Sequence, residues 1–214
     1  MAGLGCAMDS ERVDRLDTMI AEGRLIREKW TAGHGRACLL AALSPEAGAA
    51  QTAAACPAAV MPPWLAYLTP WLDDAPSEHA WPGVVRRYAS LARRWHVLDG
   101  EAWDRAKVGA LLAIVEETRM HASDDAVALA AIDGVLGWLR RGAPESDREA
   151  VANAAWAAAA ARTAAWAAAA SAAYAAAGAA ADAALAATRA AADRIAAGVL
   201  DAIEREIAEA EAGR

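Results

Sequence analysis

The sequence predicts an all-α protein in which a compact N-terminal helical bundle is followed by a long, alanine-rich amphipathic helix. Alanine makes up 30 of the 43 residues from Ala150 to Ala192, and it is the strongest helix former because it loses no side-chain rotamers. Apolar residues elsewhere recur at intervals of three and four, the spacing of one buried helix face. Residues typical of strands and hairpin turns are few, which argues against sheets.

The first fifty residues contain start signals for several short helices. Asp9–Ser10 precedes an apolar stripe, and we expect the helix that follows to continue to about Trp30. Thr31–Gly35 contains two glycines and is expected to be a loop. Arg36–Leu43 is predicted to be a short buried helix, after which Ser44 caps either a short solvated helix or a mobile loop.

The middle of the chain has clearer helical periodicity. Pro63 begins an apolar run, which Pro70 interrupts or restarts and which Asp73–Asp74 ends. Ser77 is expected to cap a helix whose apolar face extends to Trp95.

Two further helices are expected before the composition changes. The first runs from about Glu101 to Met120, and the second begins at Ser123 and ends before Gly142. The large side chains that the first should bury are Trp103, Val108, Leu111, Leu112 and Val115. Those carried by the second are Val127, Ile132, Val135, Leu136 and Leu139.

The alanine-rich segment has well-marked ends and one bulky face. Ser146 and Glu149 are spaced as a capping box, and Gly213 follows the last periodic residue. At 100° per residue, the large apolar side chains fall on one stripe and most charges lie opposite, although Glu206 falls near the stripe. We expect the stripe to be an interface with a protein partner or a second copy. Its members are Trp156, Trp166, Tyr174, Leu185, Ile195, Val199 and Ile203.

The composition shift at Gly142–Pro144 predicts a division into a helical domain, residues 1–143, and the alanine-rich segment, residues 146–213. A continuous helix of that length would run about 100 Å, far beyond the domain before it. Either the helix projects and pairs with another chain, or it breaks near Gly178 and folds back.

Charge and cysteine usage narrow the class of protein. The net charge of −7 and the pI of about 5.1 argue against nucleic-acid binding through a basic patch. Three cysteines, an odd and sparse number, are typical of a reduced cytosolic protein without a disulfide framework. Nineteen residues from Thr163 to Ala181 carry no charge, but alanine contributes little insertion energy, so an interfacial or packed soluble helix is favoured over a membrane span.

Candidate chemistry is sparse. His34 and Cys38 lie four residues apart near a helix start, where a thiolate can be activated, although a loop histidine and a buried cysteine explain them more simply. The four histidines lie on separate elements, so neither a metal site nor a cofactor is expected. A polar cluster at Asp73, Asp74, Glu78 and His79 could supply paired carboxylates, but a solvated loop is the simpler interpretation.

Alanine-rich stretches interrupted by aromatics, such as Ala154 to Tyr174, resemble segments of uncharacterised bacteriophage and prophage proteins, some of them labelled putative immunity proteins. Leu68–Asp74 and Ala89–Leu98 also look like the first half of such proteins. The resemblance implies a mobile-element origin in a bacterial host. It assigns no activity and no functional residue.

Three functions from different classes are therefore open. The leading expectation is a cytoplasmic, non-enzymatic helical protein that binds a protein partner or self-associates through the alanine-rich helix. The alternatives are an enzyme that uses Cys38 with His34 and a protein that associates with a membrane surface.

Overall fold

The computed structural model describes residues 10–120, 126–142 and 179–214, and the described part of the chain is mostly helical, as predicted. Its elements are α1 (Ser10–Ala21), β1 (Thr31–Ala32), β2 (Arg36–Ala37), α2 (Leu39–Leu43), α3 (Pro45–Ala50), η1 (Ala53–Ala55), α4 (Pro63–Asp74), α5 (Trp81–Ala92), η2 (Trp95–Val97), α6 (Gly100–Met120), α7 (Ala126–Arg140) and α9 (Ala179–Ala212).

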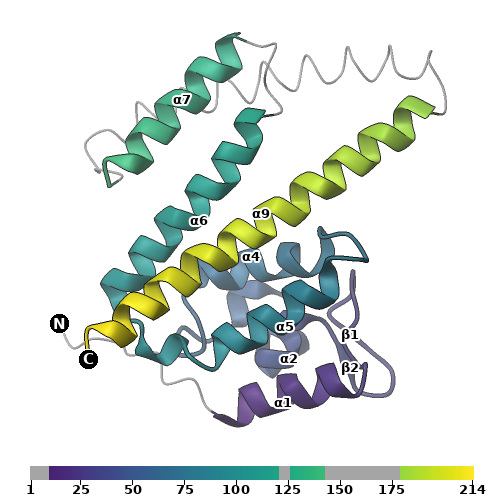
Figure 1. The fold of residues 1–214 in the computed structure, drawn as a ribbon. Coiled ribbons are helices and arrows are strands. Elements are labelled where there is room, and N and C mark those ends of the chain that lie inside the picture. The colour runs from purple at the N-terminus through teal and green to yellow at the C-terminus, as the bar shows by residue number, and fades with distance from the viewer. Residues whose placement is uncertain (1–9, 121–125, 143–178) are drawn as a thin grey trace.

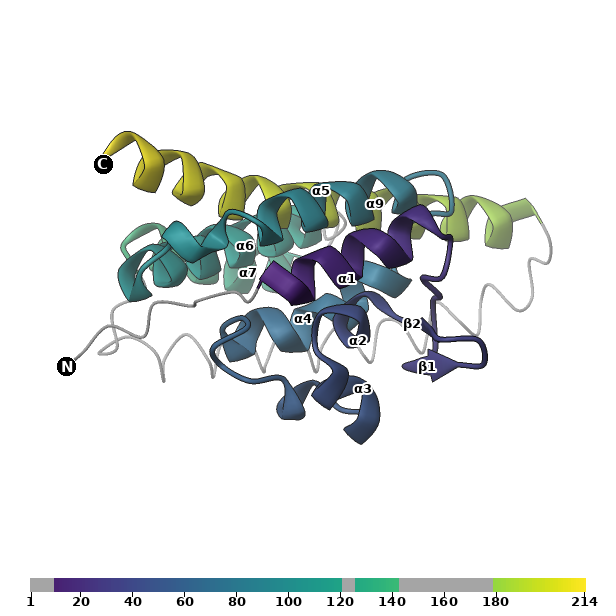
Figure 2. The same cartoon turned by 90° about the horizontal axis from the view of Figure 1, so that it is seen from below.

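The elements from α1 to α5 form a body, against which two long antiparallel helices, α6 and α9, are packed (Figures 1 and 2). Helix α6 lies between α9 and α7 (Figures 1 and 2). The C-terminal helix shares one hydrophobic core with the body, to which it contributes Ala196, Val199, Leu200, Ile203 and Ile207. The described part of the predicted alanine-rich segment, α9, therefore packs on the elements of residues 1–143.

The start of the chain departs from the predicted long helix. Helix α1 ends at Ala21, because Gly23 adopts a left-handed backbone conformation with φ of 63°. Glu28 has the same φ further along the chain. Thr31–Ala32 then pairs antiparallel with Arg36–Ala37 in a two-residue ladder. The segment expected to be a loop is thus the turn of a small hairpin.

Polar side chains accept backbone N–H groups at or just before three helix starts. The Ser44 hydroxyl accepts a hydrogen bond from the Ala47 N–H, so α3 is the short helix rather than the mobile loop. Ser77 forms the turn before α5, which begins three residues later than a cap at Ser77 implies. The Asp99 carboxylate caps α6 by accepting the Ala102 N–H at 2.8 Å.

Two further expectations about the middle helices need correction. Helix α4 continues through Pro70 instead of breaking there. In α6, Trp103 is buried as expected, but the other four large side chains assigned to the core are half-buried. The buried face of α6 consists mainly of small residues, Ala102, Ala106 and Ala110, because α9 packs closely against it. In α7, the buried residues with described side chains are Leu136 and Leu139.

Candidate functional site along the α6–α9 seam

Helices α6 and α9 meet in four layers spaced four residues apart along each helix. We call these layers the seam. From one end to the other they pair Arg105 with Glu206, Gly109 with Ala202, Ala113 with Gly198, and Glu117 with Arg194. Because residues four apart lie on the same helix face, the four pairs form one continuous line of contact.

The two central layers bring the helix backbones close together. A Cβ atom placed on Gly109 would stand 2.9 Å from the Ala202 Cβ, and one placed on Gly198 would stand 2.6 Å from the Ala113 Cβ. Both values are below the separation that real Cβ atoms adopt, so these positions require glycine. Gly198 is therefore a packing position within the continuous helix α9.

The two outer layers are ion pairs with buried carboxylates. The Arg105 Nε donates to Glu206 at 2.8 Å, and the Glu206 side chain is 8% exposed. Arg194 donates to both carboxylate oxygens of Glu117, at 2.9 and 2.6 Å, and the Glu117 side chain is 6% exposed. Such bidentate pairs fix direction as well as distance. Glu206, an exception on the predicted apolar stripe, is thus buried and paired.

Further polar contacts hold α9 on the body. Arg87 of α5 binds both Asp201 and Glu204, and Arg94 binds Glu211 at 2.6 Å. Near the middle of α9, Asp193 accepts the Ser77 N–H at 2.7 Å and the Ser77 hydroxyl at 2.8 Å. The charges predicted to lie opposite the apolar stripe therefore flank it and contact neighbouring elements.

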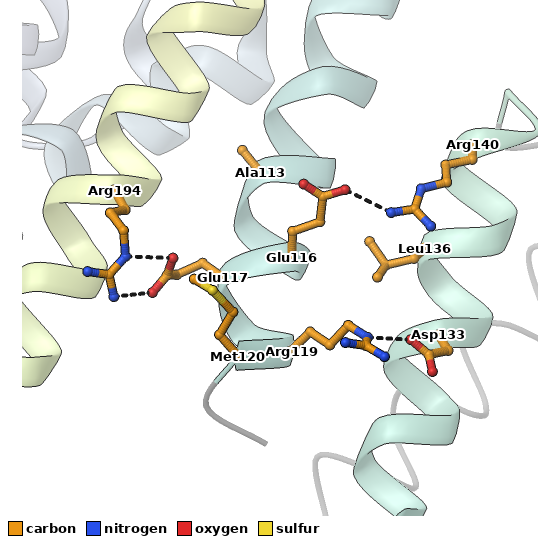
Figure 3. Close-up of a pocket in the computed structure, with 9 residues that line it drawn as sticks. All are labelled: Ala113, Glu116, Glu117, Arg119, Met120, Asp133, Leu136, Arg140 and Arg194. Atoms are coloured by element: carbon orange, nitrogen blue, oxygen red, sulfur yellow. Dashed lines mark hydrogen bonds and ion pairs between the residues drawn. The ribbon is translucent and has the colours of Figure 1, made fainter. Parts of the chain in front are cut away.

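A cavity of about 560 Å³ lies at the end of the seam, where α6, α7 and α9 diverge. Figure 3 shows two ion pairs crossing from α6 to α7 beside the seam pair Glu117–Arg194. Arg119 donates to Asp133 at 2.7 Å, and Arg140 donates to Glu116 at 2.9 Å. Because the charges lining this cavity are arranged in opposite-sign pairs, the cavity shows no preference for an anion or a cation.

One turn of α9 projects beyond its neighbours. All four residues from Ala186 to Arg189 are exposed, and four consecutive residues cover every face of a helix. From Ala192 onward, a buried residue recurs every three or four positions. The helix is thus packed along its C-terminal part and exposed at Ala186–Arg189.

The predicted interface residues fall into two groups. Val199 and Ile203 are fully buried, and Ile195 is half-buried against the same core. Within one chain, α5 and α6 pack on α9 and cover these three residues. Trp156, Trp166, Tyr174 and the side chain of Leu185 lie outside the described residues, as does the expected break at Gly178.

The environment of Cys38 does not favour a reactive thiol. Cys38 is buried and caps α2 by accepting the Ala41 N–H at 3.4 Å. Burial, and to a lesser extent the nearby charge of Asp73, raises the pKa of the Cys38 thiol above its ordinary value. His34 is exposed in the hairpin turn, with a left-handed φ of 63°. None of the hydrogen bonds described for Cys38 involves His34, so the pair predicted as a catalytic alternative is not assembled.

Asp73, expected in a solvated loop or as one of a carboxylate pair, is a fully buried side chain in the last turn of α4. Its carboxylate accepts the Leu39 N–H at 2.9 Å and the Trp81 indole N–H at 2.8 Å. Burial outweighs these hydrogen bonds and raises the pKa of Asp73 to about 6. Asp74 is exposed and bonds instead to the Glu28 N–H, so the two carboxylates do not act on a common site.

The described ranges contain neither a candidate metal site nor a candidate membrane-spanning helix. Within the described ranges, no three His, Cys, Asp or Glu side chains come together in a group suited to a metal ion. In the same ranges, no helix combines the length and apolar character that crossing a bilayer requires.

Comparison of the chain with protein-family models, with curated proteins and with solved structures returned no match. The site is therefore interpreted from its own geometry.

The sequence analysis missed the seam, although a signal for it is present. Residues 104–117 and 193–206 share Asp, Arg, Gly, Leu, Ala, Ile and Glu at equivalent positions. Each helix carries the same pattern, Arg-x3-Gly-x3-Ala-x3-Glu, and the seam is the antiparallel pairing of these two patterns. A search for internal repeats would have found them.

Proposed function

We propose that the protein is a non-enzymatic helical interaction protein, and that it associates with a second copy of itself through the projecting part of α9. The observation that carries the proposal is the exposed turn Ala186–Arg189. The body holds α9 by its C-terminal part and leaves this turn exposed to solvent. Small side chains allow another helix to approach closely, as the seam illustrates within the chain.

The buried polar groups support a non-enzymatic role. Asp73, Glu117, Glu206 and Cys38 are each engaged in a contact that positions a helix. Groups fixed in this way are used for folding rather than presented to a substrate.

The sequence resemblance to bacteriophage and prophage proteins supports a mobile-element origin and a location in the bacterial cytoplasm. The neighbouring genes would test this part of the proposal. A toxin gene beside this one would favour an immunity role, capsid or tail genes would favour a structural role, and housekeeping genes would count against a mobile element.

The association is tested by light scattering on the full chain over a range of protein concentrations. Ala187 and Ala208 are both exposed alanines of α9, the first on the projecting turn and the second on the packed part. We expect the unchanged chain and Ala208→Glu to dimerise with increasing concentration, and Ala187→Glu to remain monomeric. An unchanged chain that is monomeric throughout, or equal dimerisation of the two variants, contradicts association through this turn.

A further inference from the structure

The two helices of the seam carry the same sequence pattern, and equivalent residues of the two make the same contacts. Arg105 occupies on α6 the place that Arg194 occupies on α9, and each pairs with the glutamate at the opposite end of the other helix. Gly109 and Gly198 correspond in the same way, each facing an alanine of the other helix. The seam therefore has a local two-fold character, which is the symmetry of a self-complementary interface between identical chains.

We propose that α9 is an exchangeable element, so that in a dimer of this chain the α9 of each copy occupies the seam on the α6 of the other. This inference rests on the proposed self-association and specifies its geometry. The partner is a second copy of the chain, because the groove on α6 recognises the Arg-x3-Gly-x3-Ala-x3-Glu pattern that α9 carries.

The layers make this recognition specific in register and direction. A shift by one layer of four residues would place Gly109 opposite Glu206 or, in the other direction, Ala113 opposite Arg194. Either shift would also separate the buried carboxylates of the outer layers from their arginines. An unpaired buried charge is strongly destabilising. A partner's α9 therefore fits in the antiparallel register already present within the chain.

Exchange alone creates no new contact, since each seam is the same within or between copies. The cost of association must then be offset elsewhere. The projecting turn Ala186–Arg189 supplies the additional contact, because it lies on the helix that is exchanged. In the sequence, residues 143–178 lie between α7 and α9.

The direct test is disulfide trapping between two variants of the full chain in which the native cysteines are replaced by serine. One variant carries Gly109→Cys and the other carries Ala202→Cys, at the positions whose Cβ atoms would be 2.9 Å apart. A small shift brings this separation to the roughly 3.5–4.5 Å of a disulfide. The two are unfolded together, refolded and oxidised, and the linked peptides are identified by mass spectrometry.

We expect a link between position 109 of one copy and position 202 of the other. A single chain with both substitutions shows whether the two cysteines can join, and a mixture of Gly134→Cys with Ala202→Cys controls for random collision, since Gly134 is exposed on α7. Exchange is overturned if the single chain links and the mixture does not, or if the collision control links equally.

A second pair of variants keeps the proposal testable if cysteines disturb the seam. One chain carries Arg105→Glu with Glu117→Arg, and the other carries Arg194→Glu with Glu206→Arg. Each alone places like charges in both outer layers, whereas exchange between them restores opposite charges in both seams. We expect a one-to-one heterodimer by native mass spectrometry. Two species that remain separate overturn exchange.

The outcomes distinguish this inference from the proposed function. If the unchanged chain dimerises through the projecting turn but neither pair of variants exchanges α9, self-association stands and exchange fails. If the unchanged chain is monomeric at every concentration, the proposed self-association fails, and exchange of α9, which rests on it, fails with it.

Discussion

Gly198 of α9 lies so close to Ala113 of α6 that a Cβ atom at position 198 would stand 2.6 Å from the alanine methyl group. This contact sets how closely the two longest described helices approach. It also explains why a residue that weakens isolated helices stands near the middle of α9.

We predict that Gly198→Ala destabilises the protein despite the higher helix propensity of alanine. The propensity gain is about 1 kcal/mol, whereas overpacking costs about 1–3 kcal/mol, so we expect a net loss of up to about 2 kcal/mol. Urea denaturation monitored by circular dichroism measures the loss. As a control, Gly83→Ala should be neutral or stabilising, because Gly83 lies in α5 with open space around its Cβ position.

A compensating substitution tests whether the clash itself is the cause. Ala113→Gly removes the methyl group that an alanine at position 198 would meet, so the double variant should be more stable than the sum of the single changes predicts. A coupling energy of about 1–2 kcal/mol is expected from such a cycle. Strict additivity would mean that the contact does not limit the approach of the helices.

Much of the helical framework could be predicted because helix faces are encoded locally. The apolar spacing in α5 and the stripe through Val199 and Ile203 both correspond to buried faces in the structure. Which elements cover the stripe could not be predicted from the stripe itself. Its large side chains suggested an interface, but which chain covers them depends on where α9 packs.

The seam and the burial of Asp73 escaped the sequence reasoning for a physical reason. Large apolar side chains mark a helix face in the sequence, whereas α6 and α9 meet through glycine, alanine and charged pairs. The buried Asp73 carboxylate accepts its hydrogen bonds from Leu39 and Trp81, which are 34 and 8 residues away in the sequence. Contacts between distant segments are not visible in local periodicity.

We predict that Arg194→Ala lowers the urea midpoint substantially, because Glu117 would remain buried without its bidentate partner. Arg140→Ala is the matched control. It breaks the Arg140–Glu116 pair, in which both side chains are more than half exposed, so its effect should stay within about 0.5 kcal/mol. Equal shifts for the two variants would show that burial of Glu117 adds nothing to the pair.

Cys38 should react slowly with alkylating reagents in the folded protein. A Cys6→Ser, Cys56→Ser variant leaves Cys38 as the single thiol. We expect alkylation at pH 7.5 at least about tenfold slower than that of free cysteine, because burial both raises its pKa and blocks access. Denaturant should remove the difference. Alkylation as fast as free cysteine without denaturant would revive the catalytic alternative.

Asp73 should make stability fall as the pH rises from about 5 to 7.5. Its pKa is raised from 3.8 to about 6 in the folded protein, so the folded chain retains a proton that the unfolded chain has released. The stability from this proton is fully present below about pH 3.8 and is lost as the pH rises through about 6. The shift corresponds to about 3 kcal/mol over the whole range. Glu46, whose pKa is lowered to about 2 by Arg12, changes stability in the opposite direction but below this window.

Urea denaturation at several pH values measures how the free energy of unfolding changes with pH. Two substitutions show whether Asp73 is the group responsible. Asp73→Asn removes the titrating group and should flatten the fall between pH 5 and 7.5, whatever its effect on absolute stability. Asp74→Asn changes the net charge equally at an exposed neighbour and should preserve the slope. If the slope survives in Asp73→Asn, another group is responsible. If the unchanged protein shows no fall, Asp73 is ionised throughout this range, and its hydrogen bonds to Leu39 and Trp81 outweigh the cost of its burial.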